Sequence, residues 1–199
     1  MSFLNHNFSK SFLTSLAPVT LAVLLAGCTT VLTQTNDKPI ESDPGSRTLG
    51  AVIDDQSIET TATVNIRKTD PALERANVVV TSYNGTVLLS GQVPNEELRG
   101  RAAQVAASVK NVRRVYNELT VGPNADFTVH SSDTLLTTKV KSRLLAAKGI
   151  KDSRVKVVTE NGSVFLMGLV TQSEGDIAGK VAQETGGVQK VVRIFEYVD

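Results

Sequence analysis

The sequence predicts an α+β fold made of two tandem αββαβ modules, which follow a cleaved signal peptide and a flexible tether. Three observations support this prediction: a hairpin signal that occurs twice, helical periodicity on both sides of each hairpin, and an apolar N-terminal segment that ends at the only cysteine. A repeat of this kind indicates a duplicated structural unit. We expect each module to form a three-stranded mixed sheet packed against two helices.

The two hairpins are predicted over residues 78–93 and 155–170, where an Asn-Gly pair separates two runs rich in β-branched and apolar residues. Both residues tolerate the positive φ of a type I′ turn, which matches the twist of paired strands. The turn pairs are Asn84-Gly85 and Asn161-Gly162. Six residues after each turn glycine stands another glycine, Gly91 or Gly168, where we expect a bulge or a close approach of another backbone segment.

A helical pattern precedes each hairpin, with apolar residues at i, i+4 and i+8. These residues are Ile58, Ala62 and Ile66 in the first copy, and Leu136, Val140 and Leu144 in the second. We predict these helices over Asp54–Lys68 and Asp133–Lys148. A second helix follows each hairpin, and the second copy opens it with Thr171 and Glu174 at capping-box spacing. Closing strands are predicted over residues 112–121 and 188–198, each reached by a helical crossover and therefore able to pair in parallel.

The first residues are typical of a signal peptide, with Lys10 before an apolar stretch from Leu16 to Leu25. The run from Phe12 to Gly27 includes three hydroxyl residues and a proline, so it falls short of the ~20 predominantly apolar residues that a membrane-spanning helix needs. It ends in Leu25-Ala26-Gly27-Cys28, which resembles the lipobox of bacterial lipoproteins, so Cys28 is the predicted site of a covalent diacylglyceryl and N-acyl lipid. The alternative is a chance cysteine beside an ordinary cleavage site.

The predicted organisation assigns every residue to one of five parts. These are the signal peptide 1–27, the lipidated tether 28–50, the first module 51–121, a linker 122–131 and the second module 132–199. Without the signal peptide the chain has twenty basic and twenty acidic residues, because only Lys10 is lost. A neutral chain without tryptophan does not have the basic excess of a nucleic-acid-binding protein.

These motifs together resemble the dual-BON-domain lipoproteins of Gram-negative bacteria. The resemblance rests on the lipobox, on the duplicated Asn-Gly hairpins with their later glycines, and above all on the stretch from Asp133 to Val170. It implies αββαβ modules, residence in the outer membrane facing the periplasm, and binding of anionic phospholipid centred on the first helix of the second module. Thr29, after the cysteine, is compatible with outer-membrane sorting in that group.

Enzymatic chemistry is poorly supported by the sequence. After processing one histidine remains, His130, which we place in the linker, and no second histidine or cysteine is left to bind a metal or act as a nucleophile. Asp54 and Asp55 are adjacent carboxylates, and we expect them to cap the N-terminus of the first helix. We therefore predict a protein that is not an enzyme and has no cofactor beyond the lipid on Cys28.

The helix predicted over Asp133–Lys148 carries the candidate phospholipid site. On a helical wheel, Leu135 points away from the core stripe, with cations beside it, as a peripheral membrane contact requires. The predicted site is Leu135, Lys139, Ser142, Arg143 and Ala146. Leu135 could equally be one of the scattered leucines that are common on protein surfaces. In the lipoproteins that the chain resembles, an aromatic residue stands at this position, which predicts a weaker interfacial anchor here.

The equivalent helix of the first copy favours a site in the second. It has Ser57 at the position of Leu135, and its formal charge is −1, whereas the helix predicted over Asp133–Lys148 has +3. We therefore expect anionic phospholipids of the inner leaflet of the outer membrane as partners. The alternative is an envelope adaptor that docks other proteins without recognising lipid.

Overall fold

The computed structural model describes residues 43 and 45–198. In this part of the chain, two similar units follow each other, each with a long helix, a β-hairpin, a second helix and a closing segment of strand. The predicted α+β class and the αββαβ order of both modules are confirmed. The predicted signal peptide, Cys28 and most of the predicted tether lie outside the described residues.

Both modules place the second strand of the hairpin at the centre of the sheet. In the first module, β2 pairs antiparallel with β1 and parallel with β3 and β4; in the second, β6 pairs antiparallel with β5 and parallel with β7. The first module consists of α2 (Leu49–Thr69), α3 (Pro71–Arg75), β1 (Asn77–Tyr83), β2 (Thr86–Val93), α4 (Glu96–Ala107), β3 (Arg114–Asn117) and β4 (Thr120–Val121). The second consists of α5 (Phe127–Ala146), the 3-10 helix η1 (Asp152–Arg154), β5 (Val155–Glu160), β6 (Ser163–Val170), α6 (Gln172–Gln183) and β7 (Lys190–Tyr197).

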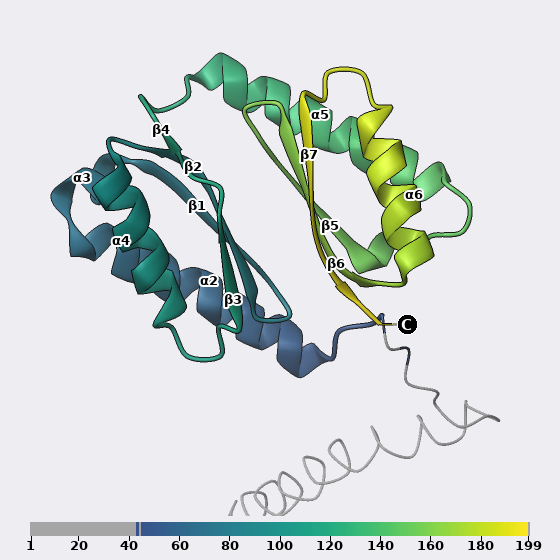
Figure 1. The fold of residues 1–199 in the computed structure, drawn as a ribbon, viewed down its shortest axis with the longest axis horizontal. Coiled ribbons are helices and arrows are strands. Elements are labelled where there is room, and N and C mark those ends of the chain that lie inside the picture. Colours follow the sequence, from purple (N-terminus) through teal and green to yellow (C-terminus); the bar gives the residue numbers. More distant parts are fainter. Residues whose placement is uncertain (1–42, 44, 199) are drawn as a thin grey trace, which may run out of the picture. The chain divides into compact units, whose positions relative to one another are not determined.

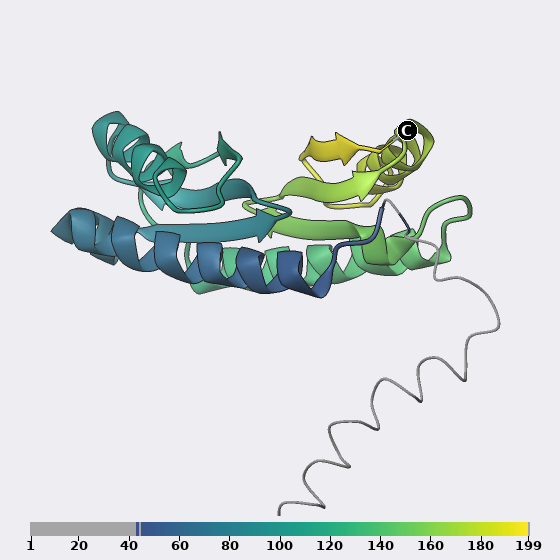
Figure 2. The same cartoon turned by 90° about the horizontal axis from the view of Figure 1, so that it is seen from below.

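The two sheets face each other, and the helices lie on their outer sides (Figure 1). In the turned view, α2 and α5 lie along one edge and α4 and α6 along the opposite edge (Figure 2). In each module the two helices pack against their own sheet, and a separate apolar core lies between them. Ile58, Ala62 and Ile66 of α2 are buried in the first core, and Leu136, Val140 and Leu144 of α5 in the second, as predicted.

A third apolar cluster joins the two modules along a surface that we call the seam. It contains buried side chains of both sheets: Tyr83, Leu88, Phe165, Met167, Leu169 and Ile194. The strands β2 and β6 are consequently buried on both faces from their second residue onward. This burial removes apolar surface from water between the modules, which is the main favourable contribution to their association.

Polar contacts close the seam around this cluster. Lys156 Nζ lies 2.9 Å from Glu59 Oε1, and the Gln92 side-chain amide donates to Glu160 Oε1 at 2.8 Å. The buried Tyr83 hydroxyl donates to the Arg154 carbonyl oxygen at 3.1 Å. Because such contacts require matched positions on both sheets, they select one relative orientation of the modules.

The segment before α2 also contacts both modules. Asp43 forms ion pairs with Arg154 and with Lys151 of the second module. Four residues later, the Arg47 guanidinium lies 3.8 Å from the ring centroid of Tyr83 and pairs with a carboxylate of α2. This part of the predicted tether is therefore packed on the folded unit.

The first helix begins earlier than predicted, and its carboxylates have a different role. Thr48 is the N-cap and accepts a hydrogen bond from Ala51 N, so the prediction that Asp54 and Asp55 cap this helix is wrong. Asp55 instead faces the hairpin and accepts hydrogen bonds from the backbone N–H groups of Asn84 and Gly85 at 2.8 and 2.9 Å. A buried carboxylate thus ties the middle of α2 to the turn.

Both hairpins turn as the Asn-Gly pairs predict. Asn84 and Gly85 have φ of 52° and 73°, and Asn161 and Gly162 have φ of 48° and 71°, in the left-handed region that a type I′ turn needs. The later glycines allow close backbone approach: a Cβ at Gly91 would collide with the carbonyl oxygen of Asn77, and one at Gly168 with that of Arg154.

Two other predicted elements differ in their bounds. The first closing strand is split into β3 and β4, because the chain between them turns the side chain of Leu119 into the core, where it is 2% exposed. Glu118 N still donates to the carbonyl oxygen of Leu89, so the chain stays beside β2 across the break. The long helix of the second module begins at Phe127 with Asp126 as N-cap, and it therefore includes residues 127–131 of the predicted linker.

The turn geometry predicts the effect of a branched side chain at Gly162. Gly162→Val should lower the free energy of unfolding by roughly 1–3 kcal/mol, because valine is strained at this φ and its Cβ would lie 2.9 Å from the Gln189 side chain. Chemical denaturation would measure the change. The control is Gly100→Val in α4, where a Cβ meets no heavy atom within 4 Å, and it should change stability little. Equal midpoints for both variants would contradict the turn assignment.

The Asp55 contact predicts a pH-dependent contribution to stability. Burial raises the pKa of this carboxyl, but hydrogen bonds from Gly85, Ser82, Asn84 and Arg47 outweigh burial and hold the pKa below its usual value. A lowered pKa stabilises the fold above the unfolded value of about 3.9, and this stabilisation disappears as the pH falls through the folded value.

Asp55→Asn should therefore lower the Tm near neutral pH, because it removes about 1–3 kcal/mol from the free energy of unfolding. The difference in Tm between the variant and the wild type should shrink below about pH 4. Thermal unfolding followed by circular dichroism across this pH range would measure both quantities. Asp54→Asn, at the exposed neighbouring position, should give only a small difference throughout. A Tm difference for Asp55→Asn that stays constant down to pH 2 would contradict the assigned role.

Candidate functional site

The outward face of α5 holds all five residues of the predicted phospholipid site. Leu135, Lys139, Ser142, Arg143 and Ala146 are all exposed. Leu135 has 64% of its surface accessible, although it is a large apolar residue. The helix places these residues together because they recur at intervals of three and four positions on the side opposite the core.

A buried carboxylate fixes the rotation of α5. Asp133 is 6% exposed and accepts hydrogen bonds from Asn161 N at 2.6 Å and from Gly162 N at 2.9 Å. It occupies the position that Asp55 has in the first module and makes the same contact with the turn. With Asp133 and the core stripe facing inward, Leu135 is held facing outward.

The exposed apolar surface of α5 is larger than predicted. Leu145 is 70% exposed and was not part of the predicted site. Residues Leu135, Thr138, Ser142 and Leu145 follow the spacing i, i+3, i+7 and i+10, which places them along the outermost line of the helix. The same wheel could have found Leu145 in the sequence, since it lies well away from the core stripe.

The exposed ionic groups of α5 carry a formal charge of +3, the value expected from the sequence, although different residues make it up. Asp133, the acidic residue of α5, is turned inward, so the exposed ionic groups of the helix are Lys139, Lys141 and Arg143. Arg143 makes a long surface contact of 3.7 Å with Glu184, which at this exposure neutralises it weakly. Lys148, the last residue of the predicted helix, lies beyond the last residue of α5, Ala146.

Exposed apolar side chains alone do not distinguish α5 from α2. The first turns of α2 expose Leu49, Val52 and Ile53, and Leu49 is 83% accessible. The helices differ in charge and in the residues at matching positions: Ser57 and Thr61 of α2 stand where α5 has Leu135 and Lys139, and both are exposed. Of these two helices, α5 alone combines an outward leucine line with three cations and no exposed carboxylate.

A groove runs beside α5 and opens next to Leu135 and Lys139. Its volume is about 380 Å³, and its opposite wall is formed by the turn at Asn161-Gly162 and by the loop before β7, which contributes Gly187 and Gln189. Apolar and polar atoms line this groove together. A small polar group bound in this groove would lie beside Lys139.

The described residues hold no cluster of metal-ligating side chains. His130 lies in the first turns of α5 rather than in a linker, and it is exposed. Within residues 43 and 45–198, no group of three or more histidine, cysteine or acidic side chains is placed to hold a metal ion. Among the helices described, none has the length and apolar content needed to cross a bilayer.

Comparison with known proteins identifies the repeated unit. Residues 54–123 and residues 132–199 each match the family model of the BON domain. These two ranges contain most of the elements of the two structural modules. The duplication seen in the hairpins and helices is thus a duplication of this domain.

Several known proteins are similar to the chain, among them a lipoprotein, a hemolysin and an osmotically inducible protein. The outer membrane lipoprotein DolP of Haemophilus influenzae is 42% identical over 160 residues, which cover 80% of this chain and 82% of that protein. The 21 kDa hemolysin of Actinobacillus pleuropneumoniae is 38% identical over 152 residues, covering 76% and 78%. Osmotically-inducible protein Y of Escherichia coli is 33% identical over 130 residues, covering 64% and 61%.

Proposed function

Since the chain belongs to the BON domain family and carries two copies of the domain, we propose that it is an outer-membrane lipoprotein that binds anionic phospholipid through α5. The proposal places the protein on the periplasmic side, where it supports the integrity of the envelope without catalysing a reaction. The observation that carries it is the outward line of α5, on which exposed leucines lie among cations and no carboxylate faces out.

The chemistry of this face suits the boundary between headgroups and acyl chains. Leu135 and Leu145 can enter the acyl boundary, because both are more than 60% exposed and lie on the same outer side of the helix. The cations on both sides of this line can meet lipid phosphates, each contributing about 1 kcal/mol near an anionic surface. Binding by α5 should therefore depend on both anionic lipid and low salt.

Covalent lipid would keep α5 near this surface. In the proposal, Cys28 carries the diacylglyceryl and N-acyl groups, and residues 29–42 connect it to the folded unit. A single acyl chain anchors a protein only marginally, whereas several chains hold it permanently. The weak contacts of α5 would then act at a high local concentration of lipid.

The anchor is tested by removing the thiol. Cys28→Ala should leave the protein unprocessed at that site or soluble in the periplasm, because no residue remains to be acylated. Membrane fractionation and electrophoretic mobility, followed by immunoblotting, would measure this. A variant that fractionates with the outer membrane and keeps the wild-type mobility would contradict the assignment of Cys28.

The lipid site is tested by changing Leu135 and Lys139 to glutamate in the mature chain with Cys28→Ser. All three apolar cores lie within residues 43–198, so this chain retains everything that its fold requires. The double variant loses a cation and gains two anions, which should cost several kcal/mol at about 1 kcal/mol per charge. Flotation with vesicles containing phosphatidylglycerol, compared with zwitterionic vesicles, would show binding that is nearly lost.

Matched positions in the first module supply the control. Ser57→Glu with Thr61→Glu introduces the same side chains at exposed sites of α2, and it should leave flotation almost unchanged. If this control abolishes flotation while the α5 variant floats normally, the lipid site belongs to the first module. If neither double variant changes flotation, α5 is not the membrane face, and docking of an envelope protein becomes the better explanation of its exposed leucines.

A further inference from the structure

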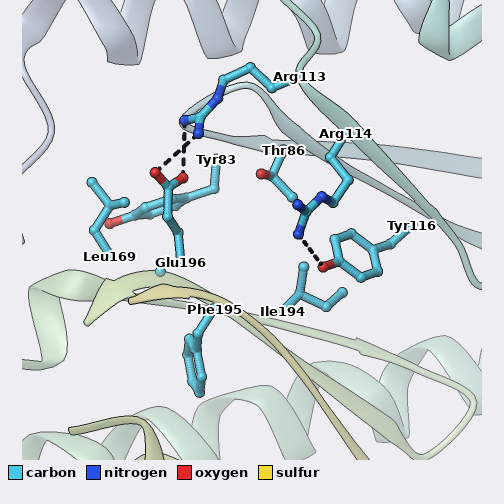
Figure 3. A pocket seen from close by; sticks show the side chains of 10 residues that line it. Tyr83, Thr86, Arg113, Arg114, Tyr116, Leu169, Ile194, Phe195 and Glu196 are labelled. Carbon is cyan, nitrogen blue, oxygen red and sulfur yellow. Dashed lines mark hydrogen bonds and ion pairs between the residues drawn. The ribbon is translucent and has the colours of Figure 1, made fainter. Parts of the chain in front are cut away.

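A second site candidate lies at the seam, on the other side of the sheets from α5. A cavity of about 190 Å³ opens between the modules there, with walls from both sheets (Figure 3). Thr86, Arg114 and Tyr116 come from the first module, and Leu169 and Ile194 from the second. At about 30 Å³ for each water, this volume is large enough for a small anion with part of its hydration shell.

Three hydrogen-bonding side chains of the first sheet, Thr86, Arg114 and Tyr116, line this cavity. Thr86 and Arg114 are register partners in β2 and β3, and Tyr116 follows two residues later on the same face. Arg114 donates to the Tyr116 hydroxyl at 3.2 Å, which leaves the proton of that hydroxyl free. Among the residues that the structure describes, neither this proton nor the Thr86 hydroxyl has an acceptor. Arg114 is exposed, and the Tyr116 hydroxyl is its one hydrogen-bond partner among these residues.

The cavity is lined by two cations, Arg113 and Arg114, and one carboxylate, Glu196, so its charged groups leave a net positive charge of one. Arg113 makes a two-pronged ion pair with Glu196, at 3.0 and 3.1 Å, so these two charges compensate each other (Figure 3). Arg114 has no carboxylate within ion-pair distance in residues 43 and 45–198. After the Arg113–Glu196 pair is set aside, the cation that remains at the cavity is Arg114, beside the hydroxyl groups of Thr86 and Tyr116.

Comparison of the two modules shows that the equivalent cation of the second module does have a carboxylate partner. Lys190 of β7 is the counterpart of Arg114, because each pairs with the first strand residue after its Asn-Gly turn. Lys190 reaches across the seam to Glu118, at 3.3 Å. The counterpart of Glu118 in the second module is Ile194, so the carboxylate that would compensate Arg114 is replaced by an apolar side chain.

We propose that this seam cavity is a binding site for a phosphate group, held by the Arg114 guanidinium and the hydroxyls of Thr86 and Tyr116. A guanidinium alone can satisfy a planar carboxylate with two parallel hydrogen bonds. Donors from three side chains that line one cavity instead suit the several oxygens of a tetrahedral phosphate. The apolar wall at Ile194 and Leu169 excludes water from one side of the anion, which strengthens these charge-assisted contacts.

The test is a titration of the mature chain, with Cys28→Ser, by inorganic phosphate at constant ionic strength, followed by backbone amide NMR shifts. Saturable shifts are expected at Thr86, Arg114 and Tyr116, with only small shifts along α5. Arg114→Gln should weaken the apparent affinity about tenfold, as expected for the loss of a charge-assisted hydrogen bond. Thr86→Val, which keeps the shape of the side chain, should also weaken it.

Lys190→Gln is the matched control, because this cation already has a carboxylate partner, and it should leave phosphate binding unchanged. Shifts that fail to saturate, that chloride reproduces at equal ionic strength, or that persist unchanged in Arg114→Gln would overturn the proposal. Acetate that binds as tightly as phosphate would overturn the choice of anion.

Glycerol phosphate then separates the two sources of a phosphate group. If it binds more tightly than inorganic phosphate, the site takes a phosphate ester of the kind found in lipid headgroups. If it binds equally or more weakly, the site takes free phosphate.

Discussion

The central strands β2 and β6 are buried on both faces, and this burial determines which surfaces of the two modules remain exposed. One face of each strand packs under the helices of its own module, and the other packs against the opposite sheet. A rotation of one module would expose the apolar seam and separate ion pairs such as that of Lys156 with Glu59. The outer sides of the helices are consequently the broad surfaces left to contact a membrane or a partner, and the rim of the seam is left for smaller ligands.

Within each module, one aspartate holds the long helix at a defined rotation. Asp55 and Asp133 accept backbone hydrogen bonds from the Asn-Gly turns, so the turn and the helix position each other. This contact satisfies turn N–H groups and also withdraws a negative charge from the outer face of the helix. In α5 the remaining exposed charges are all positive, and a structural contact of the fold thereby produces the electrostatic character of the proposed lipid surface.

Both proposed sites lie where the two copies of the repeat differ. Leu135 stands where the first module has Ser57, and Ile194 stands where the first module has Glu118. Where the copies agree, as in the turns, the later glycines and the helix core stripes, the residues are needed for packing and backbone geometry. Residues that both copies need for folding cannot easily change, whereas an exposed helix face or a position at the edge of the seam can change without loss of the core.

The sequence by itself determined the features that depend on neighbours within about ten residues. Asn-Gly turns need positive φ, the i, i+4, i+8 stripes give the inner faces of α2 and α5, and Thr171 with Glu174 forms the predicted capping box. The same periodicity predicted that Leu135 and Lys139 face outward. The apolar runs 87–89 and 164–167 are also typical of strands buried on both faces.

Only the tertiary structure decided the features that join residues far apart in the chain. Asp55 looked like a helix cap because its partner turn lies about thirty residues away. The seam and the unmatched charge of Arg114 depend on which sheet faces which, and the burial of Leu119 that splits the closing strand depends on packing against the core. Periodicity reports only whether a side chain is inside or outside, whereas the identity of its partner is set by packing between distant segments.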